Sequence, residues 1–336
     1  MSDLVVVTDA TFPDVDAEAA AARALGAEFR RHACRTDDEV ARAVAGARVA
    51  VVQFAPFGAR AVSALAPGAT VIRYGVGYNN LDTQAMRAAG VSGVYVPDYC
   101  TDEVADHTAA MVLARLRKLA AFDASVRGGD WKAVGVARPM PALRDTTIGF
   151  FGFGRIAQSV AARLAPFGFR LIACDPFMPA SGHPSLGVEA VGFDALLARA
   201  DCISLHAPAT KDTVGAFGKN AFRAMKTTAI LVNSARGDLV VEADLAEALE
   251  SGEIGGAALD VFAEEPLASD SALRRAPNLS LSPHAAWYSE VAVAELQRRV
   301  ADEISRALKG DPPRRPIPGF EREAGQRFRN EMPQEE

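Results

Sequence analysis

The chain has 336 residues, which is long for one ordinary hydrophobic core and suits two domains. Its formal net charge is -6 and its lysines and arginines form no long run, so nothing predicts a nucleic-acid or membrane surface. Four cysteines without a CxxC pair argue against a disulfide framework and against a zinc site, and no metal is expected. Without signal-peptide features or an apolar run near the about 20 residues that span a bilayer, we expect a cytoplasmic protein.

Apolar, β-rich runs alternate with alanine-rich helical stretches in the first part of the chain. The runs are LVVV at Leu4, VAVVQF at Val49 and TVIRYGVG at Thr70. Asp14 and Asp82 are candidate helix N-caps, and Thr36 with Glu39 forms a candidate capping box. Alternating β and α units predict a parallel sheet with helices on both faces.

A second series of the same kind comes after a helical stretch from about Thr101 to Leu119 and a segment, RGGDWKAVGVARPMPALRD, that has little periodicity. Its expected strands are TIGFFGFG, FRLIACD, DCISLHA, AILVNSA, GAALDVF and LSLSPH. A final helix is expected from about Ser289 to Leu308, after the second sheet is complete. If this helix packs back on the first domain, that domain is discontinuous and a cleft lies between the two.

GFGRIA, from Gly152 to Ala157, comes directly after the expected strand TIGFF and opens a helical run. In such a turn Gly152 permits the tight bend, Gly154 lets the backbone approach a pyrophosphate, and the helix amino terminus offers free N–H groups. Ala157 replaces the third glycine of the pattern at a position that needs only a small residue. The context favours a dinucleotide site over an ordinary glycine-rich turn.

Asp175 ends the run LIACD, about 20 residues beyond the glycines, where a carboxylate can accept hydrogen bonds from an adenosine ribose. The next segment, PFMPASG, has no arginine or lysine to neutralise a 2′-phosphate. This pattern favours NAD over NADP, and the structural alternative is a strand-end aspartate before Pro176.

RYGVGYNN, from Arg73 to Asn80, ends a strand of the first domain. Its two glycines allow consecutive N–H groups to face outward and bind an anion, although a hairpin-like turn explains them equally well.

Three residues that end different strands of the second domain suggest a reaction. They are Arg236 in NSARG, Glu265 in DVFAEEP and His284 in SPHAAWYSE. Each alone can be a solvated loop residue, and a lone histidine is more often structural than catalytic. Together they match the reduction of a 2-keto acid, in which arginine grips a carboxylate, histidine protonates the ketone oxygen as hydride arrives, and glutamate favours the imidazolium.

The sequence resembles the D-isomer-specific 2-hydroxyacid dehydrogenases and, within them, the branch that includes the C-terminal-binding-protein corepressors. The likeness spans about residues 45–310, and its motifs occur in the family's order and spacing: GVGYNN, GFGRIAQ, NSARGDLV, GAALDVFAEEPL and SPHAAWYSE. Ala157, Tyr78 and Asn79 depart modestly from the commoner pattern. The resemblance implies that Arg236 binds the substrate carboxylate and polarises the carbonyl, and that His284, paired with Glu265, is the acid/base.

The same resemblance implies further contacts. Val76 and Gly77 would surround the carboxylate with N–H groups, and Arg73 and Trp287 match positions that line the substrate pocket in the corepressor branch. The implied contacts to NAD are Gly152, Phe153, Gly154, Arg155, Ile156, Ala157, Asp175, Ala207, Pro208, Thr213, Ser234, Ala235 and Asp260.

We therefore expect an α/β protein with two Rossmann-like doubly wound parallel-sheet domains and a cleft between them. Residues 1–103, completed by 288–336, are expected to bind substrate, and residues 104–287 to bind NAD. The family dimerises through its cofactor domain, so the resemblance implies a homodimer whose other partner is a small 2-keto or 2-hydroxy acid.

The expected activity is that of an NAD-dependent oxidoreductase, and two alternatives remain. One is an NAD(H)-sensing dimeric interaction protein like the corepressors, which retain the triad. The other is the same fold acting on phosphite, formate or a phosphorylated hydroxy acid. Formate has no keto group to protonate, and a phosphorylated substrate calls for more basic residues than Arg73 and Arg236.

Overall fold

The computed structural model describes residues 2–321, which form two compact units. The first unit contains the described residues up to Tyr99 and those from Glu290 onward, and the second unit is Cys100–Ser289. The part of the expected first domain beyond residue 321 lies outside the described residues.

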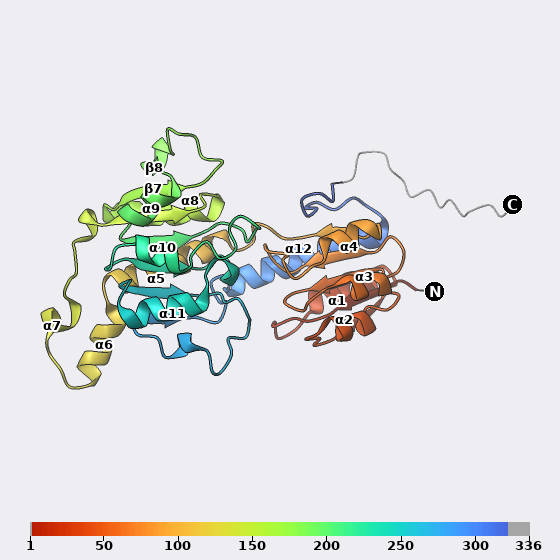
Figure 1. Cartoon of the computed structure of the whole chain (residues 1–336). Coiled ribbons are helices and arrows are strands. Elements are labelled where there is room, and N and C mark those ends of the chain that lie inside the picture. Colours follow the sequence, from red (N-terminus) through yellow and green to blue (C-terminus); the bar gives the residue numbers. More distant parts are fainter. Residues whose placement is uncertain (1, 322–336) are drawn as a thin grey trace. The chain divides into compact units, whose positions relative to one another are not determined.

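The first unit is built on a parallel sheet with the strand order β2-β1-β3-β4-β5 (Figure 1). Its strands are β1 (Leu4–Val7), β2 (Glu28–Arg31), β3 (Val49–Val52), β4 (Thr70–Arg73) and β5 (Ser92–Val94). Its helices are α1 (Asp16–Ala24), α2 (Asp37–Ala43), α3 (Ala59–Ala64), α4 (Thr83–Ala88) and α12 (Glu290–Lys309). All strands are parallel, as the alternating pattern predicted.

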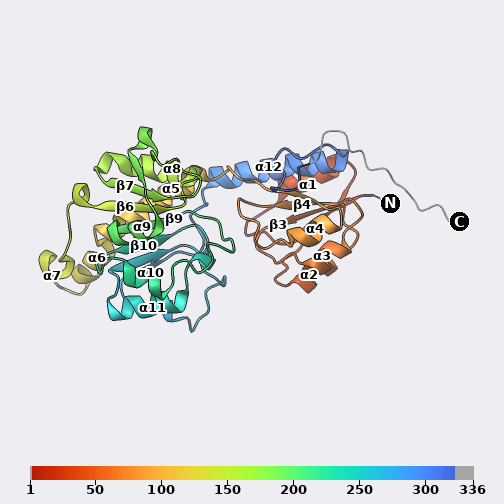
Figure 2. The ribbon, with the colours of Figure 1, turned by 45° about the horizontal axis from the view of Figure 1, so that its top comes forward.

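The last helix, α12, belongs to the first unit. It lies beside α1 and against β3 and β4 (Figure 2). Leu296, Val300 and Ile304 recur every four residues along it and are fully buried, so one apolar face of the helix packs on the sheet layer. On the other side of the sheet a second core contains residues of α2, α3 and α4, among them Val40, Ala61 and Met86.

Two of the three expected helix caps in the first unit are confirmed. Thr36 forms the capping box with Glu39, and the Asp82 carboxylate accepts the Ala85 N–H at 2.9 Å. The prediction for Asp14 is wrong, because α1 begins one residue later with Val15 at its N-cap. The Asp14 carboxylate instead accepts the Asp16 N–H at 3.3 Å, in the turn before the helix.

The second unit is built on a parallel sheet with the strand order β12-β11-β10-β9-β6-β7-β8. Its strands are β6 (Thr147–Phe151), β7 (Arg170–Cys174), β8 (Val188–Ala190), β9 (Cys202–Leu205), β10 (Ile230–Asn233), β11 (Gly256–Leu259) and β12 (Leu279–Leu281). Its helices are α5 (Thr101–Leu116), α6 (Leu119–Arg127), α7 (Ala133–Ala137), α8 (Arg155–Leu164), α9 (Phe193–Arg199), α10 (Lys219–Ala224) and α11 (Glu242–Ser251).

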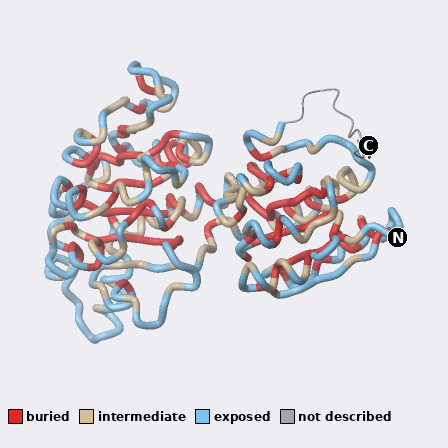
Figure 3. Tube along the Cα trace, turned by 45° about the vertical axis from the view of Figure 1, so that its right-hand side comes forward, coloured by how far each residue is buried: buried red, intermediate tan, exposed pale blue. Residues whose placement is uncertain are grey.

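Two cores lie on the two faces of this sheet. One contains buried residues of α5 and α8, and the other contains buried residues of α9, α10 and α11. The central strands β9, β10 and β11 between these layers are buried throughout (Figure 3). The chain order reverses at β6, which has β7 on one side and β9 on the other. In open parallel sheets, ligands bind at the carboxyl ends of the strands beside such a reversal, so the loops after β6 and β9 are in the position of a binding site.

A segment of the second unit lies outside these layers. The helix that was expected to continue to Leu119 ends at Leu116, and α6 and α7 come after it on the side of the unit (Figure 1). None of the residues of α6 is buried, while Trp131 is 87% and Val134 is 74% exposed. Among the described residues, no helix combines the length and hydrophobicity that crossing a membrane requires.

Candidate active site

The glycine turn between β6 and α8 has the geometry of a phosphate-binding loop. Gly152 has φ +85°, and a Cβ there would lie 2.7 Å from the backbone nitrogen of Ala207, so the turn requires glycine. Gly154 is the N-cap of α8, and a Cβ on it would meet no atom within 4 Å. Open space in front of the first N–H groups of a helix is what a pyrophosphate needs, so this turn fits a dinucleotide.

The first turn of α8 supports the same fit. Ala157 is fully buried in the core against α5, which explains why the third position of the pattern takes a small residue. Arg155 is exposed and Ile156 is half-buried. Phe153 is buried, and its N–H is turned toward Asp175.

Asp175 lies beside this loop, as its spacing predicted. One carboxylate oxygen accepts the Phe153 N–H at 2.6 Å, and the other accepts the Phe177 N–H at 2.7 Å. In the described residues it forms no ion pair with a basic side chain. The carboxylate thus joins the glycine turn to the loop after β7 through two backbone hydrogen bonds.

The loop after β9 closes against the glycine turn. Ala207 is the residue whose backbone a side chain at Gly152 would strike. Further along, the Thr213 hydroxyl donates to the Pro208 carbonyl at 2.6 Å, which fixes the loop into a compact turn. The loop that the resemblance assigned to the cofactor is thus adjacent to the glycine turn.

The turn after β10 carries Arg236 and depends on Asn233, which sequence reasoning did not single out. The fully buried Asn233 side chain donates to the Arg236 carbonyl at 2.8 Å and accepts the Ala235 N–H at 3.0 Å. The next residue, Gly237, packs so closely that a Cβ there would lie 1.9 Å from the carbonyl carbon of Phe262. The backbone of this turn therefore lies directly against the loop after β11 that leads to Glu265.

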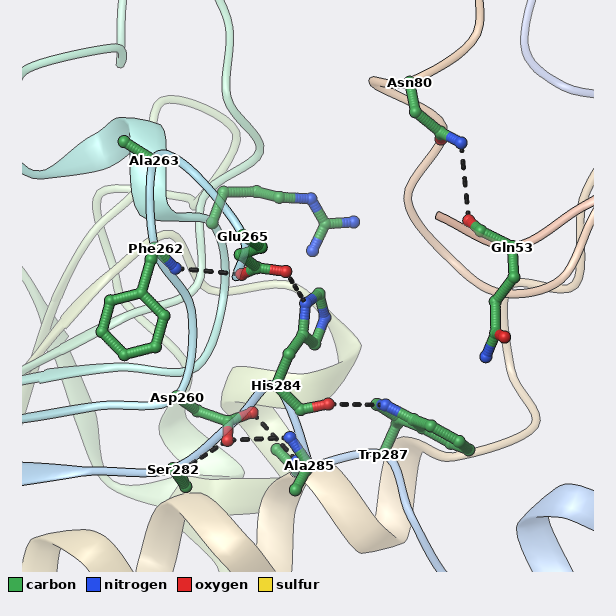
Figure 4. A network of polar contacts seen from close by, with 12 residues as sticks. Gln53, Asn80, Asp260, Phe262, Ala263, Glu265, Ser282, His284, Ala285 and Trp287 are labelled. Atoms are coloured by element: carbon green, nitrogen blue, oxygen red, sulfur yellow. Dashed lines mark hydrogen bonds and ion pairs between the residues drawn. The ribbon is translucent and has the colours of Figure 1, made fainter. Parts of the chain in front are cut away.

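Glu265 and His284 form the expected pair, with Nδ1 of His284 2.7 Å from Oε2 of Glu265 (Figure 4). The other oxygen of Glu265 accepts the Phe262 N–H at 2.9 Å. Burial by itself raises the pKa of Glu265, but the hydrogen bond and charge of His284, the Phe262 N–H and the charge of Arg236 outweigh it and leave the pKa below its ordinary value. Both side chains remain accessible, at 29% for Glu265 and 27% for His284.

The turn that carries His284 has an unusual backbone. His284 has φ +52°, a left-handed conformation that few residues other than glycine adopt. The indole N–H of Trp287 donates to the His284 carbonyl at 2.7 Å, so Trp287 folds back on the turn (Figure 4).

Asp260, expected to contact the cofactor, is fully buried, and its carboxylate accepts hydrogen bonds from Ser282, Ala285 and Ala286.

In the first unit, Arg73 ends β4 and is buried. Its Nε donates to Oδ1 of Asn80 at 3.2 Å, a second guanidinium nitrogen contacts the Tyr74 carbonyl, and the guanidinium lies over the Phe54 ring. Asn80 also donates to the carbonyl groups of Gln53 and Ala55 in the loop after β3 (Figure 4).

The turn after Arg73 supports the expected anion nest. The backbone N–H groups of Val76 and Gly77 form no hydrogen bond within the described residues, although both residues are half-buried. Half-buried N–H donors without a protein acceptor can serve a bound anion. The turn therefore leaves two donors in the position where the resemblance placed a carboxylate.

Comparisons with known proteins agree with this fold. Residues 109–286 match the D-isomer specific 2-hydroxyacid dehydrogenase NAD binding domain. The chain is 36% identical over 247 residues to a glyoxylate reductase of Korarchaeum cryptofilum, covering 72% of this chain and 74% of that one. It is 38% identical over 248 residues to a D-3-phosphoglycerate dehydrogenase of Archaeoglobus fulgidus, covering 73% of this chain and 46% of the relative. It thus spans about half the length of the phosphoglycerate dehydrogenases that it matches.

A solved structure with the same fold is the NAD-dependent formate dehydrogenase from Staphylococcus aureus in complex with NAD. The match has a TM-score of 0.83 at 28% identity and covers 92% of this chain and 96% of that one. Two parallel-sheet α/β units, the second with a glycine turn that fits a dinucleotide, are the class of fold that this match supports. The chain belongs to the D-isomer-specific 2-hydroxyacid dehydrogenase family, and its second unit contains the NAD-binding domain.

Proposed function

We propose that the protein is an NAD-dependent oxidoreductase that interconverts a 2-keto acid and a D-2-hydroxy acid. The observation that carries the proposal is the His284–Glu265 pair at 2.7 Å, with Arg236 close enough to lower the pKa of Glu265. These three side chains belong to the same unit as the glycine turn and Asp175. We assign the first unit to substrate binding and the second to NAD binding.

In the proposed reaction, bound NADH supplies the hydride that adds to the carbonyl carbon. His284 gives a proton to the carbonyl oxygen, and because Nδ1 faces Glu265 the transfer falls to Nε2. Glu265 holds the imidazole through its contact with Nδ1, and Arg236 holds the substrate carboxylate and polarises the carbonyl. Oxidation of the hydroxy acid takes the same steps in reverse.

The remaining site assignments are part of the same proposal. Arg73, Val76 and Gly77 are proposed to bind the substrate from the first unit, the last two through their N–H groups. Ser234, Ala235, Ala207 and Pro208 are proposed to contact NAD with the glycine turn.

The proposal is tested by NADH consumption with a panel of 2-keto acids that runs from glyoxylate through pyruvate to longer apolar and phosphorylated members. We expect turnover with at least one unphosphorylated keto acid and none with formate or phosphite in the oxidative direction. Formate offers no ketone oxygen for His284 to protonate. Turnover confined to formate, phosphite or the phosphorylated member would contradict the substrate class, and no turnover with any compound would contradict the enzyme assignment.

Substitution of Trp287 distinguishes a role in the substrate pocket, as in the corepressor-like branch, from a purely structural role of its indole. Its hydrogen bond to the His284 carbonyl places the ring next to the proposed acid/base. If the ring also forms a wall of the substrate pocket, Trp287→Ala loses the preference for a longer apolar keto acid over glyoxylate, because buried apolar area contributes roughly 25 cal/mol per Å². An unchanged ratio of kcat/KM for the two acids in a folded variant would leave Trp287 with the structural role alone.

The exposed face of α6 and α7 favours a second candidate property, a homodimer through the NAD-binding domain. Leu119, Val126, Trp131 and Val134 are each more than half exposed and come from one segment of the second unit. Several large apolar side chains exposed in one segment are typical of a surface that another protein covers, and we propose that a second copy of the chain covers this one. Sedimentation of the wild type and of Trp131→Ser tests this, since only the wild type is expected to be a dimer at micromolar concentration.

A further inference from the structure

The backbone of His284 needs an explanation that the proposed reaction does not provide. At φ +52° its Cβ is crowded, and such a conformation persists only where the surroundings leave no alternative. The ring position relative to Glu265 depends on this conformation, because the ring extends along the direction of the Cα–Cβ bond. Whatever holds the backbone therefore also holds the acid/base pair.

The buried residue Asp260 binds this turn through both its carboxylate and its backbone carbonyl. One oxygen of Asp260 accepts the Ser282 hydroxyl at 2.5 Å and the Ala285 N–H at 2.9 Å, and the other oxygen accepts the Ala286 N–H at 2.9 Å. The Asp260 carbonyl accepts the His284 N–H at 2.7 Å. Three consecutive N–H groups, from His284 to Ala286, are thus directed at one residue.

A carboxylate with no exposed surface calls for a compensating positive charge or a chain of donors. Among the described residues, His107 is the one basic side chain within 4 Å of the Asp260 carboxylate, with Nε2 at 3.7 Å from Oδ1. The same nitrogen lies 3.2 Å from the Ser282 hydroxyl. Because that hydroxyl donates to Asp260, it can accept from His107, which makes a continuous chain from His107 through Ser282 to Asp260.

His107 comes from α5, which is tied to the other side of the site as well. The neighbouring Thr108 hydroxyl lies 2.6 Å from the hydroxyl of Ser234, in the turn that leads to Arg236. One turn earlier, Glu103 accepts the Ser289 hydroxyl at 2.8 Å, just beyond the His284 turn. Helix α5 thus forms hydrogen bonds with both turns that carry proposed reacting groups. His107 is the residue of this helix that lies nearest to Asp260.

We propose that His107 is a positioning residue for the acid/base: through Ser282 and Asp260 it holds the backbone that presents His284 to Glu265. The inference rests on the proposed function, because the position of His284 affects a rate only if His284 transfers the proton. His107 contacts the turn that carries His284 and not the glycine turn after β6. Its substitution should therefore slow the chemical step and leave the affinity for NADH unchanged.

The test compares His107→Phe, which keeps the ring size and loses the N–H, with His107→Gln, which offers an amide N–H to Ser282. We expect kcat to fall about 10-fold in the Phe variant and to recover most of this loss in the Gln variant, as for loss of one positioned contact. The dissociation constant for NADH, measured by its fluorescence, should change less than about twofold. His32→Phe, an exposed histidine of the first unit, is the matched control and should keep the wild-type kcat.

A general loss of stability predicts a different result, since it reduces the amount of active protein and is not repaired by one amide N–H. Equal kcat values in the wild type and the Phe variant, or equal losses in the Phe and Gln variants, would overturn the inference. If the Phe variant does not fold, Ser282→Ala breaks the same chain and is expected to lower kcat by a similar factor. A wild-type kcat in Ser282→Ala would overturn the inference in the same way.

A measurement without substrate or cofactor separates this inference from the proposed function. Hydrogen exchange at the amides of Ala285 and Ala286 should be faster in His107→Phe than in the wild type and in His107→Gln, at equal thermal stability. Absence of turnover in the wild type would refute the proposed function, while the exchange rates still decide whether His107 holds the turn. Unchanged exchange in the Phe variant would refute the positioning role alone.

Discussion

The glycine turns after β4 and β6 both follow the carboxyl end of a parallel strand, but they lead the chain into different structures. After β6 the chain passes Gly152 and enters α8 at once, with open space at Gly154 and the Asp175 carboxylate beside it. After β4 the chain passes Gly75, with φ +134°, and does not enter a helix until Thr83. We propose an anion site at each turn: after β6 the helix amino terminus that follows the glycine would bind the anion, and after β4 the arginine that precedes the glycine would do so.

The largest expected effect is a loss of kcat on substitution of His284. It tests whether a residue of the second unit transfers the proton. His284→Gln removes the proton donor and keeps much of the shape, so kcat should fall by roughly 10² to 10⁴. The affinity for NADH, measured by fluorescence, should stay near that of the wild type. Near-normal turnover in this variant would make His284 a structural residue.

The two glycine turns are compared directly by substitution with alanine. Gly154→Ala adds a methyl group that meets no protein atom but enters the space for the pyrophosphate, so NADH affinity should fall about 10-fold or more at unchanged thermal stability. Gly75→Ala brings a Cβ to 2.9 Å from the Arg73 guanidinium, and should raise KM for the keto acid without changing NADH affinity. Fluorescence titration and initial rates measure both. The assignment fails if Gly75→Ala weakens NADH as much as Gly154→Ala does.

A smaller effect, on the choice between NADH and NADPH, is expected from substitution of Asp175. The charge of this residue distinguishes the glycine turn after β6 from the one after β4. Its carboxylate should repel a 2′-phosphate, so kcat/KM for NADH should exceed that for NADPH in the wild type. Asp175→Ala should narrow the ratio between the two cofactors. Comparable kcat/KM values for both cofactors in the wild type would refute the NAD preference.

The smallest effect concerns the stability of the first unit. Glu18 on α1 is fully buried, and burial raises its pKa although its hydrogen-bonding contact with the Tyr74 side chain acts in the opposite direction. The folded protein therefore holds this proton more tightly than the unfolded chain. The stability due to the neutral carboxyl is present below the unfolded value near 4.5 and is lost as the pH rises toward the folded value.

Glu18→Gln removes this pH dependence and should raise the melting temperature at pH 7 by about 2–4 °C, which corresponds to roughly 1 kcal/mol for a domain of this size. Thermal melts at pH 4.5 and pH 7 measure the difference between variant and wild type. Glu28→Gln, an exposed glutamate of the same unit, is the control. A gain at pH 4.5 as large as that at pH 7 would contradict the explanation.

Most of the fold could be predicted from the sequence because buried parallel strands are continuous apolar runs. β1, β3 and β4 lie within the expected runs, and so do the central strands of the second sheet. The edge strands β2, β5 and β8 were missed; Glu28–Arg31 in β2, for example, contains only one apolar residue and is defined by its pairing with β1. The end of α5 at Leu116 was also missed, because no sequence signal separates it from the helical stretch that continues in α6.

In the site, the sequence predicted the residues whose chemistry is visible in a motif. The Glu265–His284 contact and the position of Asp175 beside the glycine turn agree with the geometry expected of them. Asn233 and His107 were not singled out, because their roles depend on hydrogen bonds to residues far away in the chain or to their own turn. A polar residue in a buried helix face or at a strand end carries no periodic signal that reveals such a partner.

The return of α12 to the first unit affects the order in which the protein folds during synthesis. The ribosome makes α1 early, but the helix that covers it begins only at Glu290, after all of the second unit. The second unit is continuous in the chain and can fold while translation proceeds, whereas the first unit must wait for the last helix. Until Leu296, Val300 and Ile304 emerge, α1 lacks the helix that packs beside it on the first sheet, so of the two units the one that begins earlier is completed later.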